Sequence, residues 1–272
     1  MKKSDILTPI GFLFVLAVLF FGIAQDKAGV GAFIDMPSFV ITVGGSFAAV
    51  LITFSLDDLK QIPGSMKVAM QINRTNKVDL VSQFKELSRK VRKDGLLSIE
   101  DNVEEIENEF MKNGLELVID GIDMESIEEI LENQINIFES KHENSSKIYK
   151  LWGSFAPAMG MVGTLIGLIQ MLAGGLNDAA AISSGMAKAL ITTFYGTILA
   201  NTILNPIGYN IQTKCEKEVQ LMEMIICGIG SIQNGESSRI IEEKLLTYLS
   251  DSEKKNYFKR DVDDSEVDGD VA

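Results

Sequence analysis

Histidine and cysteine are nearly absent from this chain of 272 residues. Its one histidine, His142, lies in a polar stretch, and its two cysteines, Cys215 and Cys227, do not have the spacing of metal ligands. The sequence also lacks a glycine-rich phosphate loop, a zinc-binding histidine motif and a nucleophile elbow. We therefore expect no enzymatic activity, no catalytic residue, no metal site, no cofactor and no nucleic-acid partner, and we interpret these residues as structural.

Acidic and basic side chains are also missing from four long apolar runs, which cover residues 6–24, 36–56, 151–177 and 189–213. Each run is long enough to cross the ~30 Å hydrocarbon core of a lipid bilayer as a helix that rises ~1.5 Å per residue. A helix satisfies its own backbone hydrogen bonds, which the interior of a membrane requires. The sequence therefore predicts an all-α membrane protein with four transmembrane helices.

Lysine and arginine are concentrated on one side of these runs. Lys2 and Lys3 precede the first run and Lys214 follows the fourth, whereas the connections 25–35 and 178–188 hold one lysine each. Because short loops rich in basic residues stay in the cytoplasm, we expect both termini inside. The first run also resembles a signal peptide, but it is longer than the apolar stretch of about 7–15 residues that is typical of such signals.

The charged segments between and after the runs account for the formal net charge of −13 and provide room for a soluble domain. The last segment is acidic and has little apolar content, which is typical of disorder. We predict five regions: the first two transmembrane helices over 1–56, a cytoplasmic helical domain over 57–150, transmembrane helices three and four over 151–213, a cytoplasmic extension of helix four over 214–250, and a disordered acidic tail over 251–272.

Small residues recur along one side of the third run. Gly153, Ala156, Gly160, Gly163 and Gly167 share this side at helical spacing. Small side chains let the backbone of another helix come close, and they are frequent at helix contacts in membranes. We therefore predict that this side of the third helix packs tightly against another helix.

A polar stripe follows the fourth run, where Thr193, Thr197, Asn201 and Asn205 recur every four residues. Such a stripe has two interpretations. Its side chains stabilise helix packing through hydrogen bonds of about 0.6 kcal/mol each, or they line a hydrated ion path. The spacing alone favours neither interpretation.

The segment after the second run holds an amphipathic helix, whose apolar stripe includes Leu80, Phe84 and Val91. Gly95 suits the end of this helix. Ser98 then suits the N-cap of a second helix that begins with acidic residues. A basic helix end therefore adjoins an acidic helix start.

Three segments of the third and fourth runs resemble the flagellar stator family of MotA and PomA, which is more distantly similar to TolQ and ExbB. They read APAMGMVGTLIG over residues 156–167, ALITTFYG over 189–196 and NPI over 205–207. The resemblance covers the whole chain, because the four runs and the large charged segment between the second and third match the family's plan. It implies a stator subunit, in the cytoplasmic (inner) membrane of a bacterium, that couples inward ion flow to torque on the flagellar rotor.

The resemblance further implies a homo-pentamer of this chain around two copies of a MotB-like partner in the lipid bilayer. The single membrane Asp of that partner carries the ion. That Asp would supply the acid that the four runs lack. Thr164 and Thr193 would face it, and together with Thr197 and Asn201 they form the predicted ion path. The ion is H+ or Na+: the Thr164 hydroxyl offers sodium an oxygen ligand, whereas a proton path needs none.

By the same resemblance, Pro157 and Pro206 match two family prolines that couple ion passage to conformational change. A proline in a membrane helix can also make only a static kink. Arg92, Lys93 and Glu100 match charged residues that engage the rotor protein FliG. Without the resemblance, such charges are interpreted as a solvated surface.

Other classes of function remain open. A self-contained ion channel or transporter would need a polar or ionisable membrane site of its own, and the lack of charge in the runs argues against it. A membrane scaffold without transport would use the polar stripe for packing only. TolQ-like and ExbB-like energisers of other envelope machines share the motor mechanism but have three spans, so the two runs at 6–24 and 36–56 argue against them.

Overall fold

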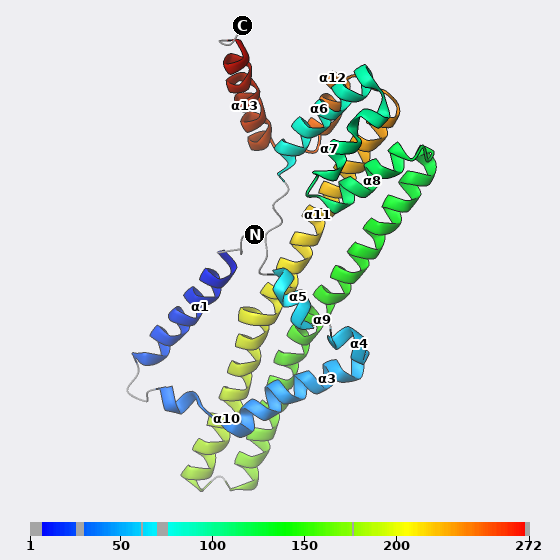
Figure 1. Cartoon of the computed structure of the whole chain (residues 1–272). Coiled ribbons are helices and arrows are strands. Elements are labelled where there is room, and N and C mark those ends of the chain that lie inside the picture. Colours follow the sequence, from blue (N-terminus) through cyan, green and yellow to red (C-terminus); the bar gives the residue numbers. More distant parts are fainter. Residues whose placement is uncertain (1–6, 26–29, 61, 70–75, 176, 270–272) are drawn as a thin grey trace. The chain divides into compact units, whose positions relative to one another are not determined.

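The structure is a computed structural model that describes residues 7–25, 30–60, 62–69, 76–175 and 177–269. Every regular element in these ranges is helical, as the sequence predicts (Figure 1). The chain divides into two compact units. Unit 1 contains residues Met1–Ile72 and Ser140–Cys215, and unit 2 contains residues Asn73–Glu139 and Glu216–Ala272.

Unit 1 holds the apolar runs. Two long helices, α9 (Met124–Ala173) and α11 (Asn205–Gln233), contribute residues to both units. The predicted region 57–150 therefore differs from either unit, because residues 140–150 of α9 group with unit 1. The other elements of unit 1 are α1 (Leu7–Ala24), η1 (Val30–Phe33), α2 (Met36–Phe39), η2 (Val40–Gly44), α3 (Gly45–Thr53), α4 (Leu56–Lys60), α5 (Ile62–Ala69), α10 (Ala179–Ile198) and η4 (Leu199–Leu204).

Two apolar runs contain a segment of π-helix, which the regular spacing of the sequence does not reveal. These segments are η2 in the second run and η4 in the fourth. Pro206 lies just after η4 and has no backbone N–H to donate to the carbonyl group one turn earlier. A wider turn at this point lets the chain rearrange its backbone hydrogen bonds, and π-bulges are frequent at functional sites.

Three apolar helices bear on the prediction of four transmembrane spans. Among the described residues, the helices Met36–Thr53 and Met124–Ala173 are long and apolar enough to cross a bilayer, and Thr8–Ala24 is a shorter apolar helix. Helix α10, which contains Lys188, is not among these candidate spans. Length and composition thus support two candidate spans, together with the apolar α1.

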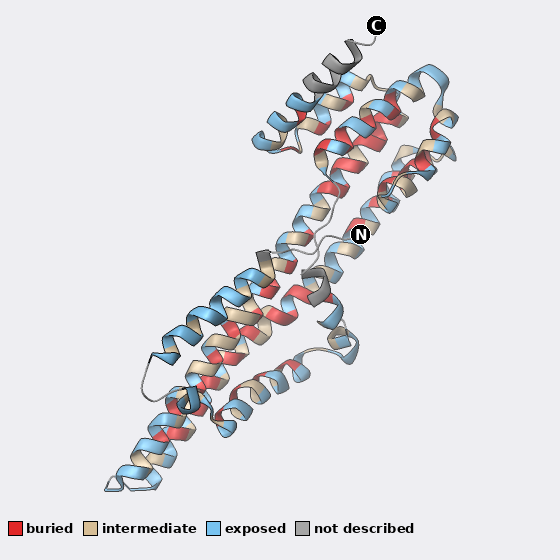
Figure 2. Cartoon of the chain, turned by 60° about the vertical axis from the view of Figure 1, so that its left-hand side comes forward, coloured by how far each residue is buried: buried red, intermediate tan, exposed pale blue. Residues whose placement is uncertain are grey.

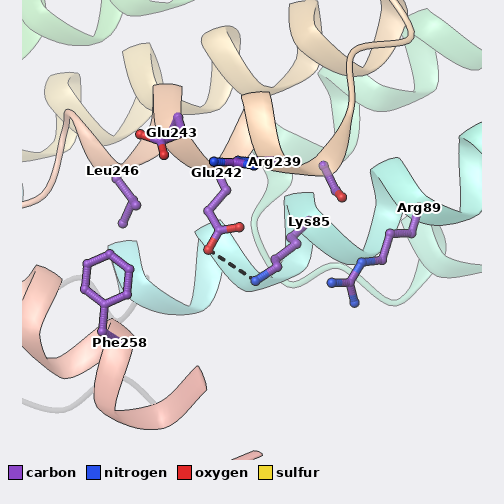
Figure 3. A pocket seen from close by; sticks show the side chains of 8 residues that line it. Lys85, Arg89, Arg239, Glu242, Glu243, Leu246 and Phe258 are labelled. Carbon is purple, nitrogen blue, oxygen red and sulfur yellow. Dashed lines mark hydrogen bonds and ion pairs between the residues drawn. The ribbon is translucent and has the colours of Figure 1, made fainter. Parts of the chain in front are cut away.

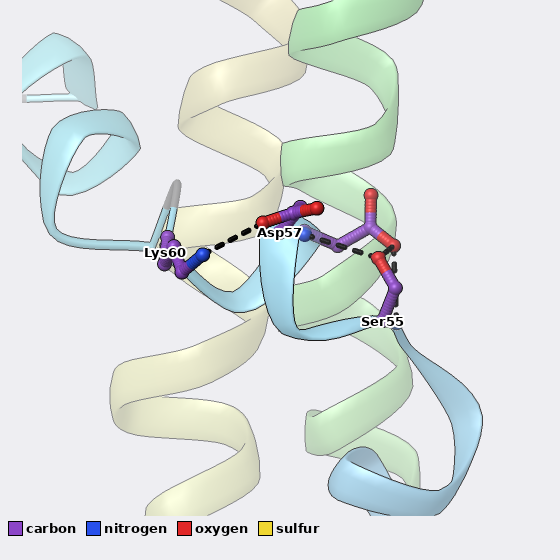
Figure 4. A network of polar contacts seen from close by, with 4 residues as sticks. Ser55, Asp57 and Lys60 are labelled. Atoms are coloured by element: carbon purple, nitrogen blue, oxygen red, sulfur yellow. Dashed lines mark hydrogen bonds and ion pairs between the residues drawn. The ribbon is translucent and has the colours of Figure 1, made fainter.

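The second run ends earlier than the predicted residue 56, because α3 stops at Thr53 and a new short helix, α4, begins. Ser55 and Asp58 cap α4 reciprocally: the Ser55 amide donates to Asp58 Oδ2 at 3.1 Å, and the Asp58 amide donates to Ser55 Oγ at 3.3 Å (Figure 4). The Ser55 hydroxyl also donates to this carboxylate and lowers the pKa of Asp58. Asn144 Nδ2 donates to Asp58 Oδ1 at 2.7 Å, which attaches α4 to α9.

Unit 2 is a helical domain with its own apolar core. The predicted amphipathic helix is α6 (Lys77–Asp94), and its stripe is confirmed: Leu80, Phe84 and Leu87 are buried, and Val91 packs against them. The Phe84 ring lies so close to Gly228 of α11 that an added Cβ would be 2.6 Å from its Cε1 atom. The other elements of unit 2 are η3 (Leu96–Ile99), α7 (Glu100–Glu104), α8 (Glu109–Ile119), α12 (Ser238–Leu246) and α13 (Asp251–Gly269).

The C-terminal part of the chain departs from two predictions. The extension of helix four, predicted over 214–250, ends at Gln233, and Gly235 with a φ of 65° turns the chain into the separate helix α12. The tail predicted to be disordered over 251–272 forms helix α13, and residues 270–272 lie outside the described residues. Tyr257 is the reason, because it is only 2% exposed and belongs to the core of unit 2.

Polar contacts hold α13 to its neighbours. Tyr257 donates its hydroxyl to Glu242 Oε1 of α12 at 2.7 Å, and Lys85 of α6 pairs with the same carboxylate at 3.2 Å. Burial raises the pKa of Tyr257 to about 12, so the phenol stays a donor at neutral pH. A pocket lies among α6, α12 and α13, with the Lys85–Glu242 pair on its wall (Figure 3). We interpret this cluster as structural.

Candidate functional site

The small residues of the third run form the contact between α9 and α10. The closeness of the two helices is measured by the room for a side chain at each glycine. A Cβ atom added at Gly160, as in alanine, would lie 3.0 Å from the backbone oxygen of Thr192, and one added at Gly167 would lie 2.6 Å from the backbone oxygen of Gly185. At Gly163 it would meet the side chain of Thr192 at 2.5 Å. The buried residues in the C-terminal part of α9, such as Gly160, Gly163 and Gly167, lie along this contact, and buried positions appear as red bands on the helices (Figure 2). The predicted close approach is confirmed, and the partner is a helix of the same chain.

The same face extends toward the predicted coupling residues. An added Cβ at Gly196 of α10 would lie 2.6 Å from the Ala156 oxygen and 3.1 Å from the Cα atom of Pro157. Pro157 is therefore at a point where the two backbones nearly touch, and α9 continues through it as one helix. Because of this contact, a movement of the backbone at Pro157 would also displace α10.

Two hydroxyl groups meet at the edge of this contact. Thr164 Oγ1 of α9 and Thr193 Oγ1 of α10 are 2.6 Å apart. Both lie near the Ala189 carbonyl oxygen, at 3.1 Å from Thr164 and 3.3 Å from Thr193. Thr197 follows one turn later and donates to the Thr193 carbonyl oxygen at 2.9 Å. The structure thus brings together Thr164 and Thr193, which the sequence places in different runs.

Three members of the polar stripe are open on the isolated chain. Thr193, Thr197 and Asn201 are exposed, and Thr164 is half-buried. Asn205 differs, because its side chain lies against Gly153 of α9, where an added Cβ would be 2.2 Å from its Oδ1 atom. The stripe therefore divides after η4: Asn205 contributes to helix packing, and the other three present hydroxyl and amide groups to whatever lies beside this face.

A row of hydroxyl and amide groups can do only part of the chemistry of ion transport. These groups donate and accept hydrogen bonds with water, and their oxygens can coordinate a hard cation. They do not ionise at physiological pH, and the third and fourth runs contain no Asp or Glu. These two runs therefore supply no charged group that could bind and release an ion.

Sequence reasoning missed a second polar stripe, formed by Ser38, Thr42 and Ser46, which recur every four residues in the second run and are all fully buried. Thr42 Oγ1 donates to the Thr192 carbonyl oxygen at 3.3 Å, and Ser46 Oγ accepts from Trp152 Nε1 at 3.1 Å. These bonds attach the second run to both α10 and α9. The four-residue spacing could have revealed this stripe, because it is the pattern of helix contacts in membranes.

The predicted rotor residues lie together on the surface of unit 2. Arg92 and Lys93 are exposed in the last turn of α6, and Glu100 is exposed in the first turn of α7. Gly95, with a φ of 87°, ends α6 and donates its amide to the Val91 oxygen at 2.9 Å, as predicted. A turn of 3-10 helix, η3, separates the basic residues from the acidic one.

The prediction that Ser98 caps the second helix is wrong. The Ser98 hydroxyl donates back to the Gly95 oxygen at 2.6 Å, and Ile99 occupies the N-cap position of α7 without a side-chain hydrogen bond. The reason is η3, which begins directly at Leu96 and places Ser98 inside a helical turn. Ser98 therefore stabilises the turn between the two helices.

Comparisons with known proteins show the family of this chain and a similar fold. The model of the MotA/TolQ/ExbB proton channel family matches residues 102–224. The chain is 40% identical to the uncharacterised protein YtxD of Bacillus subtilis over 255 aligned residues. These residues make up 93% of this chain and 93% of YtxD. It is 39% identical to Motility protein A of Borreliella burgdorferi, over 90% of this chain and 94% of the relative. The flagellar MotAB stator complex from Bacillus subtilis contains a similar chain, with a TM-score of 0.86, 27% identity, and coverage of 93% and 99%.

Proposed function

The chain belongs to the MotA/TolQ/ExbB proton channel family, and we propose that it is a stator subunit of the bacterial flagellar motor. With a MotB-like partner, it couples inward ion flow across the cytoplasmic membrane to torque on the rotor. One observation carries this proposal: a chain similar to Motility protein A over nearly its whole length has an exposed hydroxyl face on two apolar runs that contain no Asp or Glu. Such a face is useful for transport only beside a partner that supplies a carboxylate.

In this proposal the chain crosses the membrane four times and keeps both termini in the cytoplasm. Support comes from the two candidate spans, from the apolar α1, and from the uncharged run that α10, η4 and α11 share. Lys188 lies one residue before that run, at the end that faces away from the cytoplasm in this orientation. Its ammonium donates one hydrogen bond to Gln170 Oε1 at 2.7 Å, and the residue is only half-buried, as suits a lysine near the edge of the bilayer.

The ion path consists of Thr164, Thr193, Thr197 and Asn201. The short distance between the Thr164 and Thr193 hydroxyls supports this assignment, as does the exposure of the other two side chains. The partner's membrane carboxylate would lie beside this face, and the hydroxyls would exchange hydrogen bonds with it or with the water around it. Helix packing alone does not need Thr197 or Asn201, because both are exposed on the isolated chain.

Pro157 and Pro206 are the proposed coupling residues. Pro157 adjoins Gly196 of α10, and Pro206 follows the π-helical turn η4. At both positions the regular backbone hydrogen bond is missing, so the local helix geometry changes at a lower cost than elsewhere. A change in charge beside Thr193 would therefore be converted into movement of the helices that lead away from the ion path.

The assembly that we propose contains five copies of this chain around two copies of the partner. The similar structure from Bacillus subtilis is a MotAB complex, so that protein assembles with such a partner. Region 57–150 would include the surface that contacts the rotor protein FliG, through Arg92, Lys93 and Glu100. The translocated ion is H+ or Na+. Replacing sodium by potassium in the medium distinguishes them, because rotation driven by sodium would stop and rotation driven by protons would continue.

Complementation tests this function directly. The chain and its MotB-like partner are expressed together in a flagellated host that lacks stators, and swimming is expected to return only when both are present. A TolQ-like or ExbB-like energiser would leave the host non-motile although the chain is inserted and paired. Restored swimming with the chain alone would contradict the proposal and favour a self-contained channel.

Charge reversal tests the rotor surface. We expect Arg92→Ala to reduce swimming speed by about twofold or less, because an exposed charge pair contributes only about 0–1 kcal/mol. Arg92→Glu adds repulsion against an acidic rotor group and is expected to be more harmful, with partial rescue by the opposite reversal on the rotor. Glu100→Lys should behave in the same way against a basic rotor group.

The control for charge reversal is Arg239→Glu, at an exposed arginine of α12 in the same unit. This variant should swim like the unmodified chain, and the complex with the partner should form in every case. The rotor surface lies elsewhere if Arg92→Glu abolishes assembly, or if reversals on the rotor fail to rescue it.

A further inference from the structure

The turn between the predicted rotor charges displays an apolar side chain. Leu97 of η3 is 71% exposed, between the basic end of α6 and the acidic start of α7. A single exposed leucine is common on protein surfaces and requires no explanation by itself. Leu97 differs from such a residue because the turn that carries it is anchored on both sides.

The turn that carries Leu97 is fixed on both sides. Ile99 is fully buried in the core of unit 2, and Leu96 packs against that core. Ser98 donates its hydroxyl to the Gly95 oxygen at 2.6 Å. Of the three apolar side chains in this turn, two therefore anchor it and the third, Leu97, is directed outward.

A further bond connects the two helices that flank the turn. Lys90 Nζ of α6 donates to Asn102 Oδ1 of α7 at 2.5 Å. This bond, together with the buried Ile99, links the end of α6 to the start of α7 on either side of Leu97. A rigid surface loses little conformational entropy when it binds, so this arrangement is suited to contact with another protein.

Exposed charges give such a contact steering and register but little affinity. The affinity of a protein interface comes mainly from a few apolar or aromatic side chains that enter a pocket of the partner. We propose that Leu97 is the apolar anchor of the rotor contact. Its partner is a protein surface with an apolar pocket, flanked by an acidic group opposite Arg92 and a basic group opposite Glu100. This inference rests on the proposed stator function.

The test compares three changes at Leu97. Leu97→Ala removes the anchor and is expected to shorten the time that labelled stators remain at the motor by about tenfold. Leu97→Asp should be more harmful, because it places a charge in the pocket. Leu97→Met keeps the apolar volume and should remain close to the unmodified chain. None of the three should change thermal stability or the yield of the complex with the partner, because the side chain is exposed.

Two matched controls remove exposed apolar side chains elsewhere in unit 2. Ile137→Ala acts on α9, where Ile137 is also 71% exposed, and Ile240→Ala acts on α12, where Ile240 is 48% exposed. Both should leave the residence time unchanged. The anchor is refuted if Leu97→Ala and Leu97→Asp swim like the unmodified chain, or if they lower the yield of the complex, which would make Leu97 structural.

Swimming restored by the unmodified chain distinguishes a failure of the anchor proposal from a failure of the stator proposal. If it restores swimming and the Leu97 variants do so equally well, only the anchor fails. If it does not restore swimming together with its partner, the stator function itself fails, and the anchor fails with it.

Discussion

Gly167→Ala is expected to disrupt assembly although it adds a single methyl group. The new Cβ would lie 2.6 Å from the Gly185 oxygen and 2.8 Å from the Ala189 nitrogen, and backbone atoms of a helix cannot move aside alone. Overpacking of this kind typically costs about 1–3 kcal/mol, so we expect the yield of the folded complex to fall by about tenfold. Size-exclusion chromatography and thermal unfolding of the purified complex measure this effect.

Two other glycines serve as controls for this substitution. Gly22→Ala in α1 meets no atom within 4 Å, and alanine favours a helix over glycine by about 1 kcal/mol, so this variant should be neutral or stabilising. Gly163→Ala meets the Thr192 side chain, Cγ2 at 2.5 Å and Cβ at 2.6 Å, but no backbone atom within that distance, and should be harmful to a similar or smaller extent. Equal behaviour of the Gly167 and Gly22 variants would show that the α9–α10 contact is not as close as described.

Thr193→Val is expected to leave assembly intact and to reduce rotation by about tenfold or more, because it removes a hydroxyl from the ion path while keeping the shape of the side chain. The Thr164 hydroxyl loses the partner that lies 2.6 Å away but keeps the Gly160 and Ala189 carbonyl oxygens, each at 3.1 Å, as acceptors, so the fold should be little affected. Thr197→Val should be milder, since Thr197 bonds only to the carbonyl of its own helix. Motor speed and the yield of the complex are measured for each variant.

A substitution at the adjacent Thr192 is expected to affect the stability of the complex instead. Its buried hydroxyl lies 3.0 Å from both the Lys188 and the Ala189 carbonyl oxygens, which share its one hydrogen, and its side chain fills the space above Gly163. Thr192→Val should therefore lower the stability of the complex more than Thr193→Val does. Normal swimming of both Thr193→Val and Thr197→Val would mean that the polar stripe serves packing alone.

The sequence predicts where helices and their buried faces lie better than it predicts which helices pack together. Apolar runs without charge and the stripe through Leu80 and Phe84 identify helices and buried faces, because both follow from helical periodicity. The small residues from Gly153 to Gly167 indicate a close contact, but they do not say which helix supplies it. That information lies in the fold, which brings α10 against α9.

Other features could not be predicted because one or two residues outweigh the average of a segment. The acidic composition after residue 250 indicates disorder, yet the single side chain of Tyr257 joins the core and orders α13. The spacing of the polar stripe places Asn205 with Thr193, but the π-helical turn η4 changes the phase and turns Asn205 toward Gly153. Periodicity assumes a regular helix, so it fails where the helix is irregular.

Ion flux into liposomes is the most direct test of the central claim, which is that this chain supplies the wall of an ion path and a partner supplies the acid. Liposomes containing the chain alone are compared with liposomes containing the complex, and with the complex in which the partner's membrane Asp is changed to Asn. We predict flux of protons or sodium only with the unmodified complex, while the Asp→Asn complex assembles with the same subunit numbers. Flux through the chain alone would contradict the account, because none of its four apolar runs contains an acidic side chain.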